Sequence, residues 1–295
     1  MEKLVIQVRV NEGQMRSSNP NVPYSPEEIA EQVLECYAAG ASVVHYHARE
    51  RGNGKPSMDP ELYAETVRLI KRECDIITFP TLGATMKPTM PERYAHIVEM
   101  AKDPATRPDC VPADMLTVNM DFWDAERKDY RGSKDRIYLN TTGMLEDLCR
   151  TMKSVGVKPV AMMWNIAGVR LTRTFIEMGL MDEPLMCECT VFGPGYEQFG
   201  HPATVQGLQA LLDFFPEGAN WQWMVSSMGV NPFPLNAFAI ANGGHFAVGL
   251  GDYGFPELGY PTNVDLVKRG VELAETMGRE VAPAQEARRI MGFTK

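Results

Sequence analysis

The stretch SPEEIAEQVLECYAAGASVVHYH, residues 25–47, decides the fold class of this chain. Ser25 can cap a helix, and Glu28 three residues later completes a capping box. The helix runs to Gly40, a common C-terminal stop, and the apolar run Ser42–His47 follows at once. The stretch therefore predicts a helix followed directly by a strand, as in an α/β protein.

The same step recurs along the chain. Asp59 and Pro60 open the next helix, which ends near Cys74. Further strand-like runs are Leu4–Val10, Ile76–Thr81, Met115–Asn119, Pro159–Trp164, Leu185–Phe192, Trp221–Ser226 and His245–Leu250. Helical patterns separate them at 91–102, 142–155, 170–180, 203–214, 232–242 and 263–278. Eight strand-then-helix units with no linker predict a (β/α)8 barrel, a TIM barrel, as a single domain over residues 1–295.

An open, doubly wound sheet is the alternative fold. We place it second because no Gly-x-Gly-x-x-Gly turn follows the first strand. A long polar stretch, Asp121–Tyr138, follows the fourth predicted strand. In a barrel it lies at the catalytic face, so we predict that residues 121–139 form an active-site loop that covers the substrate.

Composition limits the classes of function. The chain has 295 residues, 44% of them hydrophobic and 23% charged, which is enough for a substantial core. A net charge of −9 argues against a nucleic-acid partner. No apolar run approaches the ~18 residues of a membrane helix, and the first residues do not resemble a signal peptide. Six scattered cysteines suit reduced thiols, so we expect a cytoplasmic protein without a membrane partner.

The second strand carries a possible metal site. It ends with His45 and His47, which point the same way because strand residues two apart share a face. Barrel chemistry lies at the C-terminal ends of the strands, and two neutral imidazoles are half of a zinc-type site. We therefore predict that His45 and His47 bind Zn²⁺ or another divalent metal, and the alternative is a hydrogen-bonded pair of histidines near the strand end.

The first strand has one polar face. Gln7, Arg9 and Asn11 alternate with valines, so the polar residues face the lumen, and Glu12 follows at the mouth. A buried arginine needs a partner. Arg9 is therefore either part of a core ion pair or directed at an anionic substrate, and both alternatives stay open.

Other candidate residues are less distinctive. Thr117 and Asn119 share one face at the end of the predicted fourth strand, where they could contact substrate or simply bind loops. The cysteines of Cys187-Glu188-Cys189 fit small core positions better than a thiolate site. We assign no role to His96 or His201.

Several motifs together resemble those of the β-keto acid cleavage enzyme family, over nearly the whole chain. The matching segments are NVPYSPEE at 21–28, AGASVVHYHARE at 39–50, GKPS at 54–57, TVN at 117–119, GGH at 243–245, GLGD at 249–252, GREVAP at 278–283 and EAR at 286–288. Each segment alone is weak, but the combination is specific.

The resemblance implies a zinc-dependent barrel, usually a homo-oligomer such as a dimer or tetramer. Such enzymes take a β-keto acid and acetyl-CoA and yield acetoacetate and a new acyl-CoA. The resemblance also implies roles for individual residues. His45 and His47 match the family's metal ligands, Thr117 matches a substrate-contacting threonine, and Asp252 matches an aspartate that serves the proton chemistry.

The chain departs from the family pattern at the eighth strand. The family usually has Arg-x-Gly-x-Glu-Asp there, with the Glu as the third protein ligand, whereas this chain has Ala247 and Gly251 at the Arg and Glu positions. Glu12 or Asp252 could be the third ligand, since the first and eighth strands are neighbours in a closed barrel. Arg9 could supply the guanidinium that Ala247 lacks.

The predicted pocket also differs on the fifth strand. Met162 and Asn165 stand where carboxylates are common in the family, and Met162, Met163, Trp164 and Phe122 are either pocket or core residues. The leading hypothesis is the family reaction on a β-keto acid that the sequence does not identify, with Arg9, Asn11, Glu12 and Asn119 binding the substrate. The alternatives are a different metal-assisted C–C lyase or hydrolase, or a non-catalytic relative that binds a small acid.

Overall fold

The computed structural model describes residues 1–83 and 87–293, and these form one barrel. The parallel sheet has the order β3-β2-β1-β12-β11-β10-β9-β4, which is the sequential order of a (β/α)8 barrel. Its strands are β1 (Ile6–Arg9), β2 (Val43–Tyr46), β3 (Ile77–Pro80), β4 (Cys110–Asp114), β9 (Lys158–Met163), β10 (Leu185–Phe192), β11 (Trp221–Met228) and β12 (His245–Val248). Between the edge strands, the Asp109 N–H donates to Thr78 O at 3.1 Å. The predicted fold class is confirmed.

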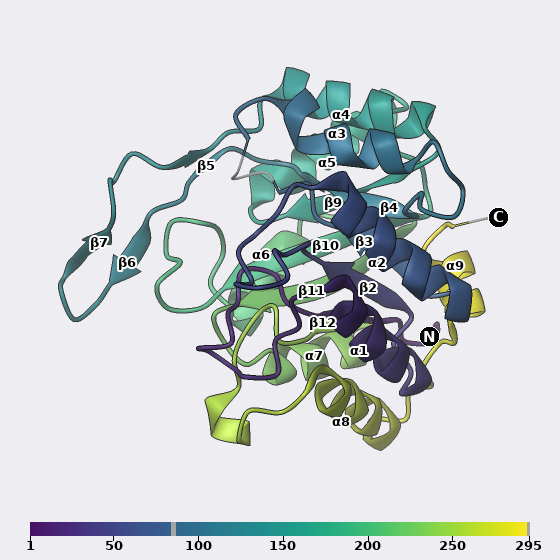
Figure 1. The fold of residues 1–295 in the computed structure, drawn as a ribbon. Helices are drawn as coiled ribbons and strands as arrows, with labels where there is room; N and C mark the ends of the chain where they lie inside the picture. The colour runs from purple at the N-terminus through teal and green to yellow at the C-terminus, as the bar shows by residue number, and fades with distance from the viewer. Residues whose placement is uncertain (84–86, 294–295) are drawn as a thin grey trace.

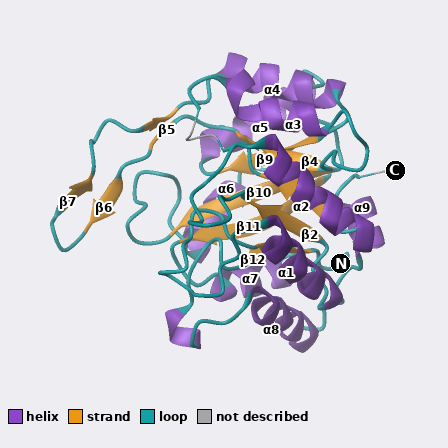
Figure 2. Ribbon diagram, in the orientation of Figure 1, coloured by secondary structure: helices purple, strands orange, loops and turns teal. Residues whose placement is uncertain are grey.

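Helices surround this sheet (Figures 1 and 2). They are α1 (Pro26–Ala38), α2 (Pro60–Glu73), α3 (Met90–Met100), α4 (Thr142–Ser154), α5 (Ile166–Glu177), α6 (Val205–Leu212), α7 (Phe233–Ala241), η1 (Pro256–Leu258), α8 (Asn263–Thr276) and α9 (Ala284–Ile290). The capping box predicted at Ser25 and Glu28 is present. Among the described residues, no helix combines the length and the apolar character that crossing a bilayer requires.

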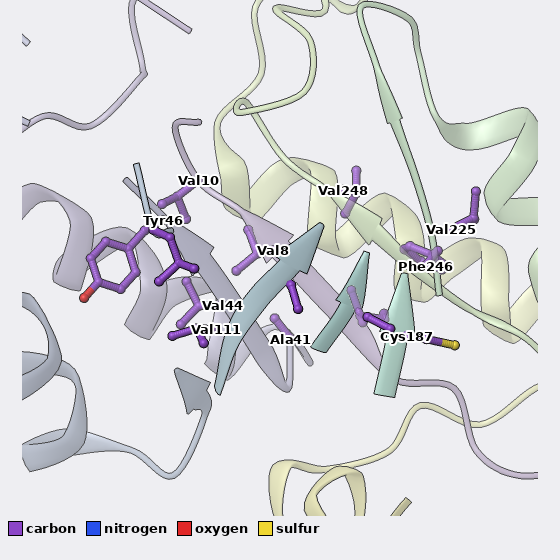
Figure 3. Packing of buried hydrophobic residues seen from close by; sticks show 14 of the residues in the cluster. Val8, Val10, Ala41, Val44, Tyr46, Val111, Cys187, Val225, Phe246 and Val248 are labelled. Atoms are coloured by element: carbon purple, nitrogen blue, oxygen red, sulfur yellow. The ribbon is translucent and has the colours of Figure 1, made fainter. Parts of the chain in front are cut away.

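The side chains of each barrel strand alternate between two packed regions. Figure 3 shows Val8, Val44 and Val248 among the residues of the layer between the barrel wall and the helices. Their sequence neighbours belong to a second cluster inside the barrel, which includes Val43 and Ala247. Cys187 and Cys189 lie in the first layer, as predicted, and all six cysteines are free thiols within the described ranges.

The C-terminal segment closes the floor of the barrel. Ala287 on α9, with Met291 and Phe293 after it, belongs to the same interior cluster as Val5 on β1 and Val160 on β9. The sequence analysis did not predict α9. Because α9 covers the floor, the mouth at the carboxyl ends of the strands is the end that remains for ligands.

The fourth barrel strand was predicted at the wrong place. The sequence analysis assigned it to Met115–Asn119, whereas the structure has it at Cys110–Asp114. Pro112 lies in the middle of the true strand and weakened its pattern, since proline cannot donate to a ladder. The alternating residues at 117–119 instead lead into a separate excursion from the barrel.

This excursion, residues 118–138, is called the arm below. It was predicted as a loop, but it contains two short antiparallel ladders. The first joins β5 (Val118–Asn119) to β8 (Ile137–Tyr138), and the second joins β6 (Phe122–Asp124) to β7 (Asp129–Arg131). Figure 1 shows the arm projecting from the barrel on the side away from α9 and both termini.

Candidate metal centre and the charged cluster beneath it

The two histidines of β2 face each other across a short gap. His45 Nε2 and His47 Nε2 lie 3.3 Å apart. The His45 ring packs edge-on against Phe79, with centroids 4.8 Å apart. His45 Nδ1 is buried and has no hydrogen-bond partner in the described part of the chain, so packing against Phe79 sets the orientation of its ring.

Glu12 is the third donor at this gap. Its Oε1 lies 3.1 Å from His45 Nε2, and its Oε2 lies 3.4 Å from His47 Nε2. Glu12 follows β1 and has a φ of +35°, a conformation that is costly for a residue with a side chain. Such strain persists only where the surroundings enforce it.

Arg49 enforces this turn. The Arg49 side chain is buried, and its Nη2 donates to the carbonyl oxygens of Asn11 at 2.9 Å, of Gln14 at 3.1 Å and of Glu12. Its Nη1 donates to Gly54 O at 2.8 Å. Arg49 therefore ties the strained turn after β1 to the segment that follows β2.

Asn11 aligns the two strand ends. The His47 backbone N–H donates to Asn11 Oδ1 at 2.9 Å, and Asn11 Nδ2 donates to His47 O at 2.9 Å. Asn11 is completely buried. It was predicted to bind substrate, but its amide is occupied by backbone, and the structure assigns it the positioning of His47 instead.

The three residues are spaced to fit a metal ion. Zinc bonds of about 2.0–2.1 Å at tetrahedral angles separate neighbouring donors by about 3.3–3.4 Å. The two imidazole nitrogens are 3.3 Å apart, and one Glu12 oxygen lies 3.1 Å from His45 while the other lies 3.4 Å from His47. Burial lowers the pKa of His47, against the opposing charge of Glu12, which favours the neutral imidazole that a metal needs. The described residues form this one group of metal-type donors.

Gly251 makes room for Glu12. A Cβ placed on Gly251 would lie 2.6 Å from Glu12 Cγ and 2.9 Å from Arg9 O, which is closer than real contacts allow. The Glu12 side chain therefore occupies the space that a side chain at position 251 would use. The combination of Glu12 after the first strand and Gly251 after the eighth is therefore a consistent alternative to a glutamate ligand at position 251.

Beneath the donors lies a charged cluster centred on Arg9, which is 4% exposed. Its terminal nitrogens donate to Glu12 and to Glu188 on β10, and its Nε lies 2.9 Å from Asp252 Oδ1. Gln7 Nε2 also donates to Glu188, at 3.1 Å. The structure thus supports the ion-pair alternative for Arg9, because each of its three guanidinium nitrogens faces a carboxylate of the protein.

The charged cluster shifts the pKa values of Glu12 and Asp252 in opposite directions. Burial opposes ionisation of Glu12, but Arg9 and the two histidines lower its pKa well below the usual value. Burial raises the pKa of Asp252 well above its usual value, because Arg9 only partly compensates and Glu12 and Glu188 add to the rise. Neither Asp252 oxygen accepts an aligned hydrogen bond from the described residues.

Two predicted site residues lie outside the barrel wall. Thr117 is exposed, and its Oγ1 accepts a hydrogen bond from the Asn140 backbone at 2.9 Å. Asn119 is exposed on β5 of the arm. Neither contacts the metal-type donors in the part of the chain that the structure describes. Both residues were expected at the mouth because the fourth strand was predicted too far along the chain. The strand ends at Asp114, so Thr117 and Asn119 lie beyond it.

Three polar residues around the mouth of the barrel escaped the sequence analysis. Glu188 faces the lumen because Cys187 and Cys189 on either side face the helices, a parity that the motif already carried. Asp114 was hidden by the misplaced strand. No local signal identifies Arg49, since its partners are carbonyl oxygens from distant turns.

Aromatic side chains line the lumen on the β4, β9 and β10 side. Trp164 is within ring-contact range of Tyr138, at a centroid distance of 5.6 Å, and of Phe192, at 5.1 Å. Phe122 reaches this interior cluster from the arm, and Met162 belongs to it too. Of the residues predicted as pocket or core, Met163 lies in the outer layer, whereas the other three lie on the lumen side.

Comparison with known proteins identifies the family of this chain. The family model described as beta-keto acid cleavage enzyme matches residues 3–293. The chain belongs to the β-keto acid cleavage enzyme family. It is 32% identical to the 3-keto-5-aminohexanoate cleavage enzyme of Acetoanaerobium sticklandii over 100% of both chains. It is 27% identical to the 3-dehydrocarnitine:acetyl-CoA trimethylamine transferase of Rhizobium meliloti, over 96% of this chain and 94% of that one.

A solved structure shares the fold of this β-keto acid cleavage enzyme family member. ObcA, in a ternary complex with a C4-CoA adduct and oxalate, has a TM-score of 0.69 at 18% identity, covering 92% of this chain and 68% of the other. At that identity the likeness concerns the fold alone.

Proposed function

We propose that this chain is a divalent-metal-dependent β-keto acid cleavage enzyme. It converts R–CO–CH₂–COO⁻ and acetyl-CoA into acetoacetate and R–CO–CoA. The observation that carries the proposal is the triangle of Glu12, His45 and His47, whose spacing suits a tetrahedral metal. Family membership supports the reaction, since a curated relative is named for an acetyl-CoA-dependent transfer.

His45, His47 and Glu12 would hold the metal, and Zn²⁺ suits this donor set best. A bound metal would act as a Lewis acid that stabilises negative charge on the keto oxygen of the substrate. Glu12 takes the place of the glutamate that is absent at position 251. The strained turn around Glu12 and the tight fit against Gly251 support this exchange.

Asp252 is the residue that we propose for the proton transfer. The carbon between the keto and carboxylate groups must lose a proton before it can attack the thioester of acetyl-CoA. In that attack a C–C bond forms and CoA leaves as the thiolate. The thiolate then bonds to the original keto carbon, the C–C bond to that carbon breaks, and acetoacetate takes the proton back from Asp252.

Other roles stay predictions. Arg9 holds Glu12, Glu188 and Asp252 in place, so we assign it positioning rather than substrate binding. The role that the resemblance implies for Thr117 and the substrate binding predicted for Asn119 have no support from the exposed positions of these residues. A dimeric or tetrameric assembly, a cytoplasmic location and the covering of substrate by residues 121–139 also remain to be tested.

The reaction is tested with a panel of β-keto acids and purified, metal-analysed protein. We expect near-stoichiometric divalent metal, and equal amounts of acetoacetate and acyl-CoA that form only when acetyl-CoA is present. Consumption of β-keto acid without acetyl-CoA would identify a lyase or hydrolase instead. Protein that neither contains nor takes up metal would contradict the proposal.

The third ligand is tested by exchanging two positions. Glu12→Ala should lower zinc affinity, because only two protein donors remain. Glu12→Gly combined with Gly251→Glu should restore part of it, since this removes the Glu12 Cβ and Cγ that a side chain at 251 would meet, and a glycine lets the turn after β1 shift Arg9 O away from the new Cβ. Gly251→Ala alone should displace Glu12 and weaken zinc binding. Gly143→Ala is the matched control, because a Cβ there meets no atom within 4 Å.

A further inference from the structure

Asp114 is a carboxylate of the barrel mouth that the chemistry above does not use. It ends β4 on the same face as Cys110, which belongs to the interior cluster. In the ladder Asp114 is paired with Met162, and Met162 is paired with Glu188. Asp114 therefore faces the same lumen as Glu188, two strands away.

Tyr138 holds Asp114 in one orientation. The Tyr138 hydroxyl donates to Asp114 Oδ2 at 2.5 Å. Tyr138 is 5% exposed at the base of the arm, where the Arg93 guanidinium lies 5.6 Å from the centre of its ring. The arm thus returns to the barrel at this residue.

The other Asp114 oxygen, Oδ1, is left for a ligand. Asp114 is partly exposed, and within the described ranges Oδ1 accepts no hydrogen bond and Asp114 forms no ion pair. Burial raises the pKa of Asp114 to about 6, and the charges of Glu12 and Glu188 add to the rise. The group is therefore a carboxylate at neutral pH, without a cationic partner.

The Tyr138 ring, whose hydroxyl orients Asp114, lies against a second aromatic ring. The Tyr138 ring lies 5.6 Å from that of Trp164, and Trp164 Nε1 is buried with no partner among the described residues. Ring faces attract cations, and more strongly when water is excluded. A carboxylate next to aromatic rings suits a cationic hydrogen-bond donor.

The charge of the lumen favours the same ligand. The carboxylates of Glu12, Asp114 and Glu188 meet the guanidinium of Arg9, while burial raises the pKa of Asp252 and so opposes its ionisation. A divalent metal adds two positive charges and the carboxylate common to all β-keto acids removes one, which leaves the occupied site at about −1. A substrate with a second carboxylate would increase this excess, whereas a cationic tail would remove it.

We propose that Asp114, oriented by Tyr138, is a specificity-determining residue that selects β-keto acids whose tail carries an ammonium group. It disfavours neutral tails and rejects tails that end in a carboxylate. This inference rests on the proposed function and adds the residue that reads the tail. Asp114 acts through direct contact with the substrate, and Tyr138 is a positioning residue.

Binding of three uncleavable ligands to the zinc-loaded protein tests the inference by calorimetry. The ligands are 4-amino-3-hydroxybutanoate, 3-hydroxypentanoate and 3-hydroxyglutarate, which have cationic, neutral and anionic tails and lack the keto group. The wild type should bind the cationic ligand most tightly. Asp114→Asn should weaken that ligand about 10- to 100-fold, the value of a charge-assisted hydrogen bond. It should leave the neutral ligand nearly unchanged and strengthen the anionic one.

Two further variants separate recognition from folding. Tyr138→Phe should shift the preference in the same direction but less, because the carboxylate remains and only its orientation is lost. Asp147→Asn is the matched control, since Asp147 on α4 likewise accepts a hydrogen bond from a tyrosine hydroxyl, that of Tyr94 at 2.9 Å, but lies on the outer surface. It should change no preference. Thermal unfolding of each variant shows that it is folded.

Equal binding of the three ligands by the wild type, or of none, would overturn the inference, as would an equal loss for all three in Asp114→Asn. Failure of the proposed function looks different, because then no β-keto acid yields acyl-CoA. An enzyme that makes acyl-CoA and keeps its tail preference in Asp114→Asn refutes only the role of Asp114.

Discussion

The mouth and the floor of the barrel each hold a buried histidine in a different environment. At the mouth His45 Nε2 faces His47 Nε2 at 3.3 Å and Glu12 at 3.1 Å. At the floor His245 Nδ1 accepts a hydrogen bond from the Val5 backbone at 2.9 Å. The floor histidine accepts a hydrogen bond from a backbone N–H. The mouth histidine instead faces another imidazole and a carboxylate, which together can bind a cation.

The buried arginines of the two ends differ in the same way. Arg49 at the mouth holds the strained turn of Glu12, and Arg279 at the floor donates to carbonyl oxygens of Glu2 at 3.0 Å, of Ile240 at 3.4 Å and of Gly244. Both guanidiniums tie segments together through carbonyls. Only Arg49 holds the turn of a proposed metal ligand, Glu12. The same substitution should therefore affect zinc affinity at the mouth and stability alone at the floor.

The largest expected difference concerns metal binding by the histidines. His47→Ala should weaken zinc binding more than about 100-fold, since losing a ligand costs more than losing its supporting contacts. His245→Ala should leave zinc affinity unchanged and lower stability by about 1–3 kcal/mol, because the Val5 N–H loses its acceptor. Competition with a chromophoric chelator and urea unfolding measure the two effects. Equal zinc affinity in His47→Ala and wild type would contradict the site.

A smaller difference is expected for the arginines. Arg49→Lys should lower zinc affinity about 10- to 100-fold, because lysine cannot donate to the carbonyls of Asn11, Glu12 and Gly54 together. Arg279→Lys, the matched change at the floor, should lower the unfolding temperature without altering zinc affinity. Comparable zinc affinities in both variants would show that Arg49 serves the fold alone.

The smallest effect is a pH dependence at the floor. Burial, helped by Arg279, lowers the pKa of His245 to about 3, against about 6.5 in the unfolded chain. The unfolded chain therefore binds a proton that the folded chain does not, and the penalty grows by about 1.4 kcal/mol per pH unit below 6.5.

The free energy of urea unfolding at pH 7.5 and 5.5 measures this penalty. His245→Asn keeps an acceptor for Val5 but does not titrate, so it should lose about 1.4 kcal/mol less than the wild type over this interval. Both proteins share every other titrating group. Identical losses in the two would mean that His245 does not contribute.

Much of the fold and half of the site could be predicted from local pattern. The alternation on β1 placed Arg9 in the lumen, and the two-residue spacing of β2 placed His45 there. The strand at Leu185–Phe192 was predicted with its bounds. Pattern failed at β4, where Pro112 interrupts the strand and the alternation after it belongs to the arm. Thr117 and Asn119 were misplaced for that reason.

The sequence by itself determined the repeating strands and helices, the lumen-facing parity and the two histidines, because each depends on residues close together in the chain. Only the tertiary structure favours Glu12 over Asp252 as the proposed third ligand, because Glu12 lies beside both imidazoles and Gly251 leaves room for its side chain. It also brought Tyr138 to Asp114 and Arg49 to the turn of Glu12. Contacts between distant segments form when the barrel closes, and no local pattern encodes them.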